Sequence, residues 1–273
     1  MEVLSNKIDR KQLKPGDHIY SLRQAYLYAH HGIYVREGMV INFTRGTSGT
    51  QTLFDRLFTS SFPALNARIP CQKCVDANQT KSNGVIMSCL DCFLSGGELY
   101  LFKYGVSCAL FLAQARGGTC TLASSDPAEE VICRAIYLLE NGFGDYNVFK
   151  NNCEDFAIYC KTGLLVTGNI SVAGGSGQAA SCSAAASSIA TLPLRFVTSS
   201  FCGITLASCG TYCIKRLVSD IKFRHEILND AKKVPVEKIH EIATKNKCLF
   251  SCVFTQSFRF PRQKCHENKE AYM

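Results

Sequence analysis

The first twenty residues of this 273-residue chain lack the uninterrupted apolar stretch that directs a protein into the secretory pathway. Without secretion, the sixteen cysteines of the chain are not expected to form a disulfide framework. We therefore expect a cytoplasmic protein whose cysteines serve as free thiols or as metal ligands. The apolar content of 47% is typical of a folded protein with a substantial core.

Charge is almost absent from residues 163–214, where Arg195 is the only charged side chain. Residues 171–195 are rich in Gly, Ala and Ser, which is typical of a flexible linker. Residues 196–214 are apolar and long enough to span a bilayer, and a basic pair follows them. Their Ser and Thr content equally fits a helix that packs on the domain. We expect membrane association through this segment, as a span or as a surface contact.

Residues 215–273 carry most of the formal net charge of +8 and are expected to form a basic C-terminal tail. Such a tail favours an anionic surface, which can be phospholipid or nucleic acid. The tail contains no recognisable nucleic-acid-binding motif, so we expect a phospholipid or membrane surface and no nucleic-acid partner. A solvated tail without a partner is the alternative that charge alone leaves open.

The stretch HHGIYVREGMVINF predicts a β-hairpin. A three-residue loop at residues 36–38 pairs Val35 with Met39 and places the apolar side chains on one face. His30 and Asn42 then share the opposite face, within side-chain reach of each other. A two-residue loop would separate them and mismatch the apolar residues, so we favour the three-residue loop.

A short helix is expected to begin at Cys153, in the stretch NNCEDFAIYCKTG. An asparagine precedes it as an N-cap, and Gly163 follows it as a stop signal. Cys153 shares a helix face with Cys160, which fits two buried and inert thiols. Backbone N–H groups in the first turn also stabilise a thiolate, the nucleophilic form of cysteine. Glu154 and Asp155 oppose this effect, so activation of the thiol requires a nearby imidazolium.

A cysteine-rich insertion at about residues 70–95 contains two Cys-x2-Cys pairs. They are Cys71 with Cys74 and Cys89 with Cys92. This spacing resembles that of zinc ribbons, in which two tight turns supply four thiolates at the corners of a tetrahedron. Four thiolates leave no open coordination position, so a zinc ion here would be structural. Unligated thiols in an apolar segment are the alternative.

The stretches LKPGDHIY, HHGIYV, GMVINF and NNCEDFAIYC together resemble the lecithin:retinol acyltransferase-like family, and CLDCFLSGG and GGTCTLASSDP resemble its plant branch. The match covers residues 13–170 in the right order and predicts one domain over that range. The resemblance implies an α+β fold of the circularly permuted papain-like, NlpC type. In that fold an antiparallel sheet packs against the helix that bears the cysteine. The apolar segment and the basic tail follow this domain.

The same resemblance assigns roles to individual residues. Cys153 takes the position of the nucleophile and His30 that of the general base and acid, while His31 replaces a tryptophan. Asn42 replaces a second histidine and is expected to orient the His30 ring. His18, in the stretch GDHIY, either lines this site or, as we expect, is a strand histidine that faces solvent.

The chemistry that the resemblance implies is thiol-dependent acyl transfer. An acyltransferase or phospholipase of this kind attacks glycerophospholipid esters and forms an acyl-thioester on Cys153. Water or another small acceptor then receives the acyl group, and no cofactor is required. Two other functions fit the sequence. Asn42 favours a catalytically weak or inactive module that binds lipid or protein, and the cysteine pairs favour a metal-handling protein.

Overall fold

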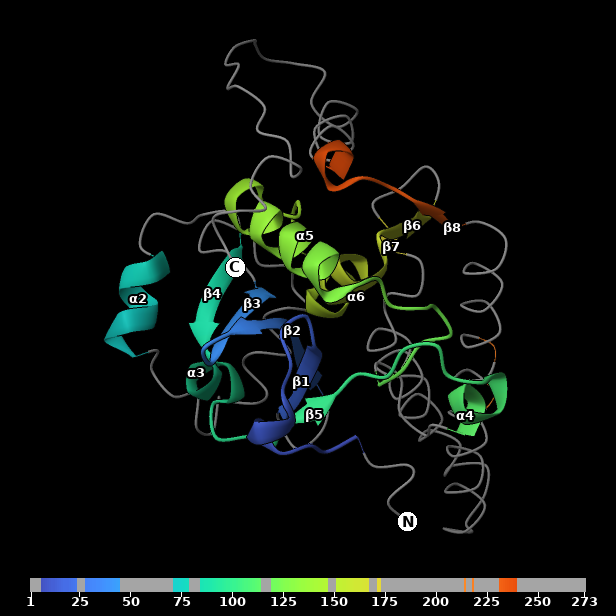
Figure 1. Cartoon of the computed structure of the whole chain (residues 1–273), viewed down its shortest axis with the longest axis horizontal. Coiled ribbons are helices and arrows are strands. Elements are labelled where there is room, and N and C mark those ends of the chain that lie inside the picture. The colour runs from blue at the N-terminus through green and yellow to red at the C-terminus, as the bar shows by residue number, and fades with distance from the viewer. Residues whose placement is uncertain are drawn as a thin grey trace, which may run out of the picture.

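The computed structural model describes residues 6–23, 28–44, 71–78, 84–113, 119–146, 151–166, 171–172, 214, 218 and 231–239. These residues adopt an α+β fold built around a five-stranded antiparallel sheet with the strand order β4–β3–β2–β1–β5 (Figure 1). The α+β class and the antiparallel sheet confirm the coarse part of the predicted fold.

The main sheet consists of β1 (His18–Arg23), β2 (Tyr28–Arg36), β3 (Met39–Phe43), β4 (Val85–Cys89) and β5 (Tyr100–Leu101). A second, three-stranded sheet contains β6 (Leu164–Val166), β7 (Ser171–Val172) and β8 (Ala231–Lys233). The helices are the 3-10 helix η2 (Arg10–Gln12) and the α-helices α2 (Gln72–Asn78), α3 (Leu90–Leu94), α4 (Cys108–Ala113), α5 (Ala128–Asn141) and α6 (Cys153–Thr162).

The β2–β3 hairpin has the register that the sequence predicts over most of its length. Gly32 pairs with Asn42, and Ile33 pairs with Ile41. His30 lies two residues before Gly32 and therefore on the same face of the sheet as Asn42. The predicted sharing of one face by these two polar side chains is confirmed.

The turn of this hairpin differs from the prediction. The chain reverses over Glu37 and Gly38 alone, both with positive φ (50° and 72°), as in a type I′ turn. Met39 consequently pairs with Arg36, and the predicted pairing of Val35 with Met39 was wrong. A β-bulge at Val35 adds one residue to β2. It compensates for the shorter turn and leaves the register beyond it unchanged.

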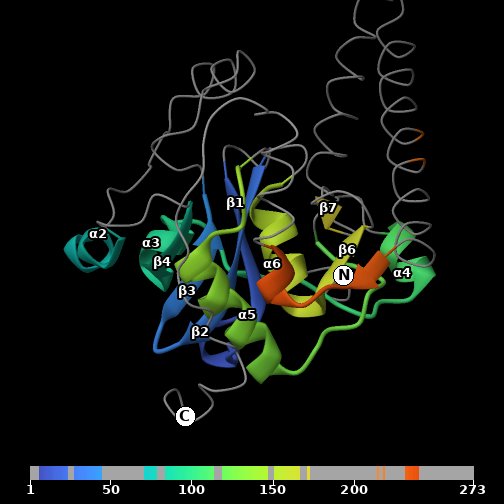
Figure 2. The ribbon, with the colours of Figure 1, turned by 90° about the horizontal axis from the view of Figure 1, so that it is seen from above.

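Both faces of the main sheet are buried. One face, which carries Ile33, Ile41 and Phe43, packs against α5 and α6. The opposite face packs Val40 against Phe93 of α3 in a separate hydrophobic cluster. Figure 2 shows the sheet between α3 and α6. Side chains on alternate positions of each strand therefore contact different helices.

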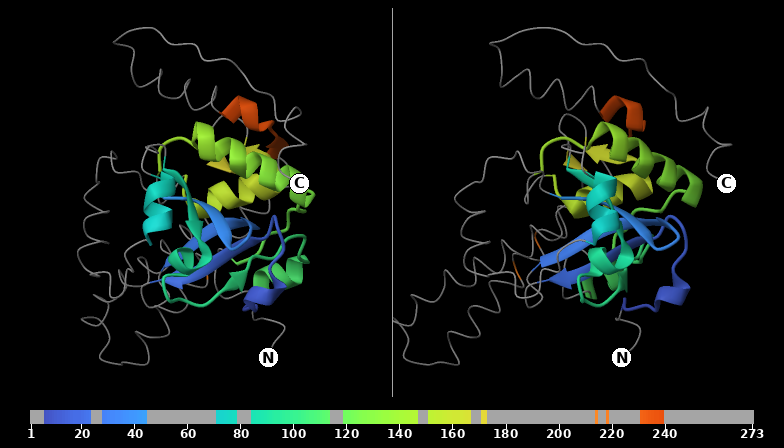
Figure 3. Two further views of the ribbon diagram at one scale, coloured as in Figure 1. Left: turned by 60° about the vertical axis from the view of Figure 1, so that its left-hand side comes forward. Right: turned by 90° about the vertical axis from the view of Figure 1, so that its left-hand side faces the viewer.

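Residues 231–239, which belong to the expected basic tail, are part of the folded domain. β8 pairs with β6, and Val236 and Ile239 are buried in the core that α6 shares. The hydroxyl of Tyr159 donates to the carbonyl oxygen of Val234 at 2.7 Å. Figure 3 shows this segment, in orange, on the side of α5 and α6 that faces away from the main sheet.

The expected linker and apolar segment lie outside the described residues, except for residues 171–172 and 214. Within the described ranges, no helix is both long enough and apolar enough to cross a bilayer.

An ion-pair network around Asp126 joins α5, α6 and β8. Its carboxylate oxygens lie 2.7 Å from Arg134 and 2.7 Å from Lys233. Arg134 also donates to the carbonyl oxygen of Cys160 at 2.9 Å. The side chains of Arg134 and Asp126 are only 11% and 16% exposed. Little water therefore screens this pair.

We expect the substitution Arg134→Met to lower the free energy of unfolding by about 2–3 kcal/mol, because it removes one partner of a mostly buried charge. Urea denaturation of both proteins measures the difference. The control is Arg10→Met, since Arg10 and Asp91 form an ion pair of the same 2.7 Å length with side chains 57% and 69% exposed. It should cost less than about 1 kcal/mol. Equal losses in the two variants would contradict this account.

Candidate functional site

A complete capping box holds the N-terminus of α6. The side-chain oxygen of Asn152 accepts hydrogen bonds from the backbone N–H groups of Glu154 (2.8 Å) and Asp155 (3.2 Å). A carboxylate oxygen of Asp155 accepts from the backbone N–H of Asn152 at 2.8 Å. The helix ends at Gly163, whose φ of 67° lies in the left-handed region. The predicted start at Cys153 and the predicted stop are confirmed.

The sulfur of Cys153 lies inside the protein against β2. The thiol donates to the carbonyl oxygen of Ala29 at 3.7 Å, and Ala29 directly precedes His30. Cys153 and Cys160 are both 0% exposed. Burial raises the pKa of the Cys160 thiol and keeps it protonated. Two buried thiols therefore share one helix, and Cys153 is the one at its N-terminus.

His30 and Asn42 are in direct contact. Nδ2 of Asn42 donates to Nε2 of His30 at 3.0 Å, and Oγ of Ser88 donates to Oδ1 of Asn42 at 3.3 Å. Asn42 and Ser88 are both buried. The His30 ring also packs against Phe93 of α3, with the ring centroids 5.1 Å apart. The hairpin thus holds His30 within a buried set of polar and aromatic neighbours.

Cys153 and His30 approach β2 from different sides. Ala29 and His31 face α6, whereas the His30 ring faces α3 because side chains alternate along the strand. The sulfur meets the main chain of β2 at Ala29, and the imidazole contacts Asn42 and Phe93. His30 and Asn42 are in side-chain contact, and Cys153 contacts the backbone of the residue beside His30.

A buried polar chain on the α6 side was not predicted from the sequence. Nε2 of His18 lies 2.9 Å from Nδ1 of His31, and Nδ1 of His18 lies 2.7 Å from the hydroxyl of Tyr104. His18 is only 1% exposed, so the expectation that it faces solvent was wrong. Phe102 stacks on its ring with the centroids 4.3 Å apart. Tyr104 is 86 residues from His18 in the sequence, and no spacing motif connects them.

The environment of this chain keeps two of its members neutral at neutral pH. Burial lowers the pKa of His18 well below its ordinary value, and the nearby His31 and Lys161 lower it further. Burial raises the pKa of Tyr104 well above its ordinary value, with smaller contributions from Cys160 and Glu154. The folded protein therefore excludes a proton that unfolded His18 would bind in mild acid.

Stability is expected to fall as the pH drops below about 6.5, the ordinary pKa of histidine. In that range the unfolded state takes up the proton that the folded state excludes, which costs up to about 1.4 kcal/mol per pH unit. Urea denaturation at neutral pH and in mild acid measures the loss. His18→Gln replaces the imidazole with an amide that still forms hydrogen bonds but does not titrate, so this variant should show a weaker pH dependence. An unchanged dependence in that variant would assign the effect to other groups.

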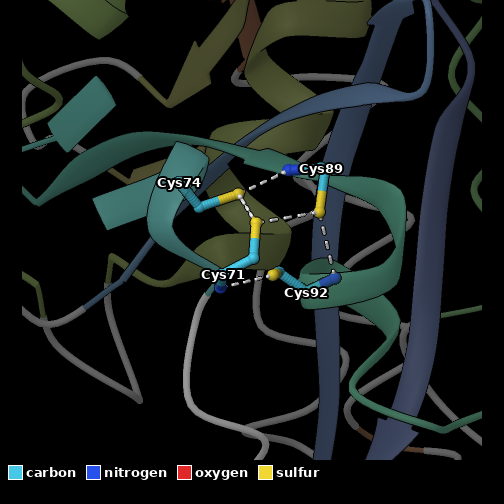
Figure 4. Close-up of side chains that lie close together, drawn as sticks. All are labelled: Cys71, Cys74, Cys89 and Cys92. Carbon is cyan, nitrogen blue, oxygen red and sulfur yellow. Dashed lines mark hydrogen bonds between the residues drawn. The ribbon is translucent and has the colours of Figure 1, made fainter. Parts of the chain in front are cut away.

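Four cysteine sulfurs converge where α2, the end of β4 and α3 meet (Figure 4). The four-cysteine cluster comprises Cys71, Cys74, Cys89 and Cys92, whose sulfur atoms all lie within 4.8 Å of one another. The sulfur of Cys71 is 3.5 Å from that of Cys74 and 3.9 Å from that of Cys89. A tetrahedral zinc–thiolate site with bonds of about 2.3 Å has sulfur–sulfur edges of about 3.8 Å. The cluster could therefore hold a metal ion.

Backbone N–H groups orient three of these sulfurs. Cys71, Cys89 and Cys92 donate their N–H groups to the sulfurs of Cys92 (3.2 Å), Cys74 (3.1 Å) and Cys89 (3.5 Å), respectively. Hydrogen bonds from the backbone and thiol of Cys74 lower the pKa of Cys71 to about 7. Burial raises the pKa of Cys74 to about 12. A bound cation would favour the thiolate form of all four.

Comparisons with known proteins agree with the resemblance seen in the motifs. The sequence profile described as "Lecithin retinol acyltransferase" matches residues 11–166. A plant protein, Protein LEAD-SENSITIVE 1 of Arabidopsis thaliana, is 52% identical over 230 residues, which cover 83% of this chain and 87% of that protein. Its name refers to sensitivity to lead and specifies no reaction. No solved structure matches the chain.

Proposed function

Because the chain belongs to the lecithin retinol acyltransferase family, we propose that it is a thiol-dependent acyltransferase or phospholipase that acts on glycerophospholipid acyl esters. The position of Cys153 carries the proposal. This thiol lies at the N-terminus of α6, and its sulfur is 3.7 Å from the carbonyl oxygen of Ala29, next to His30. The permuted papain-like arrangement that the family implies is part of the same proposal.

The proton of the Cys153 thiol is assigned to Nδ1 of His30. This assignment requires the neutral ring to carry its own proton on Nε2, with the Asn42 amide turned so that its oxygen accepts from Nε2–H both before and after the transfer. It also requires the His30 ring to reach past the main chain of β2 at Ala29, where the sulfur lies. Ser88 can support either orientation, because its hydroxyl donates to an amide oxygen and accepts from an amide nitrogen.

The acyl-transfer step then follows from these positions. The Cys153 thiolate attacks the ester carbonyl carbon, and the carbon–sulfur bond forms as the carbonyl oxygen becomes an oxyanion. Backbone N–H groups near the start of α6 are assigned to this oxyanion. His30 protonates the leaving alkoxide as the carbon–oxygen bond breaks, and it later deprotonates the acceptor. The reaction uses no cofactor.

Membrane contact is part of the proposal because the proposed substrate is a membrane lipid and because two segments of the chain favour a phospholipid surface. Cys153 is fully buried, so an ester reaches the sulfur only after a change in conformation. The apolar residues 196–214 and the basic residues of the tail favour a cytoplasmic protein held at a phospholipid surface. Such a surface supplies the acyl donor at high local concentration.

A second candidate function is lipid or protein binding without turnover. Asn42 stands where the family usually has a histidine, and an amide stabilises imidazolium less than a charged partner does. The burial of Cys153 favours the same alternative. This candidate predicts ligand binding with no covalent intermediate, which is the point at which the two functions differ.

We further propose that the four-cysteine cluster holds one structural Zn²⁺. The sulfur–sulfur distances of 3.5 and 3.9 Å support tetrahedral thiolate ligation, and the ligand set leaves no open position for catalysis. A closed site of this type stabilises the insertion and does not pass metal on. This proposal therefore opposes a metal-handling function for the chain.

Incubation of the full-length protein with phosphatidylcholine vesicles should produce a single acyl adduct, detected by intact-mass measurement and located on the Cys153 peptide. Cys153→Ala should abolish the adduct and the release of fatty acid, and His30→Gln should lower the rate by about 10²–10⁴-fold. Cys160→Ala is the matched control, since it also removes a fully buried thiol from α6. It should cost about 1 kcal/mol of stability and retain the adduct. Activity that survives Cys153→Ala would exclude the mechanism.

Asn42→Asp should move the alkaline limb of the pH–rate profile upward by about one unit, because a carboxylate beside the ring favours the imidazolium. Asn42→Leu, which has similar size and no polar group, should lower the rate about tenfold or more without that shift. Rates of fatty-acid release across the pH range measure both effects. An identical profile in the wild-type protein and Asn42→Asp would rule out a role for Asn42 in orienting His30.

A further inference from the structure

We propose that the metal held by the four-cysteine cluster positions the His30–Asn42 pair, through Ser88 on one side and Phe93 on the other. The metal itself touches neither residue of the pair nor the substrate. Ser88 and Phe93 are positioning residues, each adjacent in sequence to a metal ligand. The inference rests on the proposed function only for the role of His30 in acyl transfer. The coupling between metal and histidine can be measured without any reaction.

The first connection runs through the end of β4. Cys89 is the last residue of this strand, and Ser88 immediately precedes it. Oγ of Ser88 donates to Oδ1 of Asn42 at 3.3 Å. Val40 pairs with Ser88 across β3 and β4, so the serine faces Asn42 only while β4 keeps its register. A metal bound to Cys89 fixes the end of that strand and hence the hydroxyl that orients the Asn42 amide.

The second connection runs through α3. Cys92 immediately precedes Phe93, whose ring lies 5.1 Å from the His30 ring. Gly32 leaves the space for this contact, since a Cβ atom at that position would lie 2.9 Å from a ring carbon of Phe93. The phenylalanine is therefore closely confined between the hairpin and α3. A shift of Cys92 moves the buried Phe93 side chain, and the His30 ring that packs against it must move as well.

The elements that carry these ligands are too short to hold their positions alone. α2 has seven residues and α3 has five, whereas isolated helices shorter than about 12 residues are marginal in water. α3 buries Leu90, Phe93 and Leu94. Of the α2 side chains whose burial is described, only that of Cys74 is buried. Thiolate ligation would therefore add a strong connection between α2 and the sheet.

Hydrogen bonds from a side chain of α2 also attach this helix to the backbone of β4. The side chain of Asn78 both donates to the carbonyl oxygen of Met87 (2.7 Å) and accepts from its backbone N–H (3.0 Å). It thus takes the place of a neighbouring strand at this residue. The same amide donates to the carbonyl oxygen of Cys74 at 2.6 Å. Metal ligation and this amide together attach α2 to the strand that carries Ser88.

The experiment measures zinc content and the His30 ring in the same samples. The full-length protein, purified without added metal, should contain one zinc ion per chain, as measured by elemental mass spectrometry. The chain has six histidines, so the side-chain resonances of His30 can be assigned by their loss in His30→Gln. Chelation of zinc should shift these resonances, and Zn²⁺ added back should restore them. The rate of fatty-acid release should fall about 10–100-fold on chelation.

Three variants separate the steps of the argument. Cys71→Ser should lose zinc and shift the His30 resonances, although Cys71 is far from Ser88 and Phe93 in sequence. Cys133→Ser is the matched control, because Cys133 is a free, half-buried cysteine of α5 outside the cluster, and it should change neither. Ser88→Ala should keep its zinc and still shift the His30 resonances. This variant tests the connection even if Cys71→Ser does not fold.

Each outcome bears on one claim. Absence of bound metal, or disulfides among the four cysteines, would overturn the metal centre. Bound zinc whose removal leaves the His30 resonances in place would overturn the coupling. If the resonances respond to zinc but no acyl adduct ever forms, the coupling stands and the proposed acyl-transfer function is wrong.

Discussion

The register of the β2–β3 hairpin is the constraint on which both the core and the candidate site depend. A slip by one residue would move every side chain of a strand to the opposite face. In the observed register, Ile33 and Ile41 lie in the core beneath α5 and α6, and His30 lies beside Asn42. The bulge at Val35 maintains that register despite a two-residue turn. Burial of the apolar face therefore also assembles the polar pair on the other face.

The candidate site draws on both faces of the sheet, with β2 between them. α6 brings the Cys153 sulfur to the main chain at Ala29, while the α3 side supplies the contacts of His30. Different parts of the structure therefore position the Cys153 sulfur and the His30 imidazole. The sulfur depends on the capping box at Asn152 and on the packing of α6. The imidazole depends on the hairpin and on Phe93 of α3, and α3 also contains Cys92 of the four-cysteine cluster.

Local signals in the sequence were sufficient for several features. The N-cap and the glycine stop define α6, the apolar alternation defines the hairpin register, and the spacing of the four-cysteine cluster predicts its convergence. Each of these depends on residues that are close in the chain or on a pattern with a known period. The bulge at Val35 was missed because a two-residue turn with one bulged residue gives the same register as a three-residue turn. The apolar pattern determines the register and does not distinguish these two arrangements.

Other features depend on contacts that leave no periodic pattern. β5 has two residues and β8 has three, which is too short for alternation to be recognised. The contact of His18 with Tyr104 depends on the short region around β5, and the burial of Val236 depends on β8. These residues look like parts of a surface strand and of a charged tail when read alone. Only the tertiary arrangement reveals that they belong to the interior.

β8 brings the chain back to β6, on the side of that strand opposite β7. The two points at which the chain passes residue 172 and residue 231 are therefore both held by one strand, and the entropic penalty of joining two such points grows only slowly with the length of chain between them. A single proteolytic cut between β7 and β8 would leave two fragments that remain associated through β6, Val236 and Ile239.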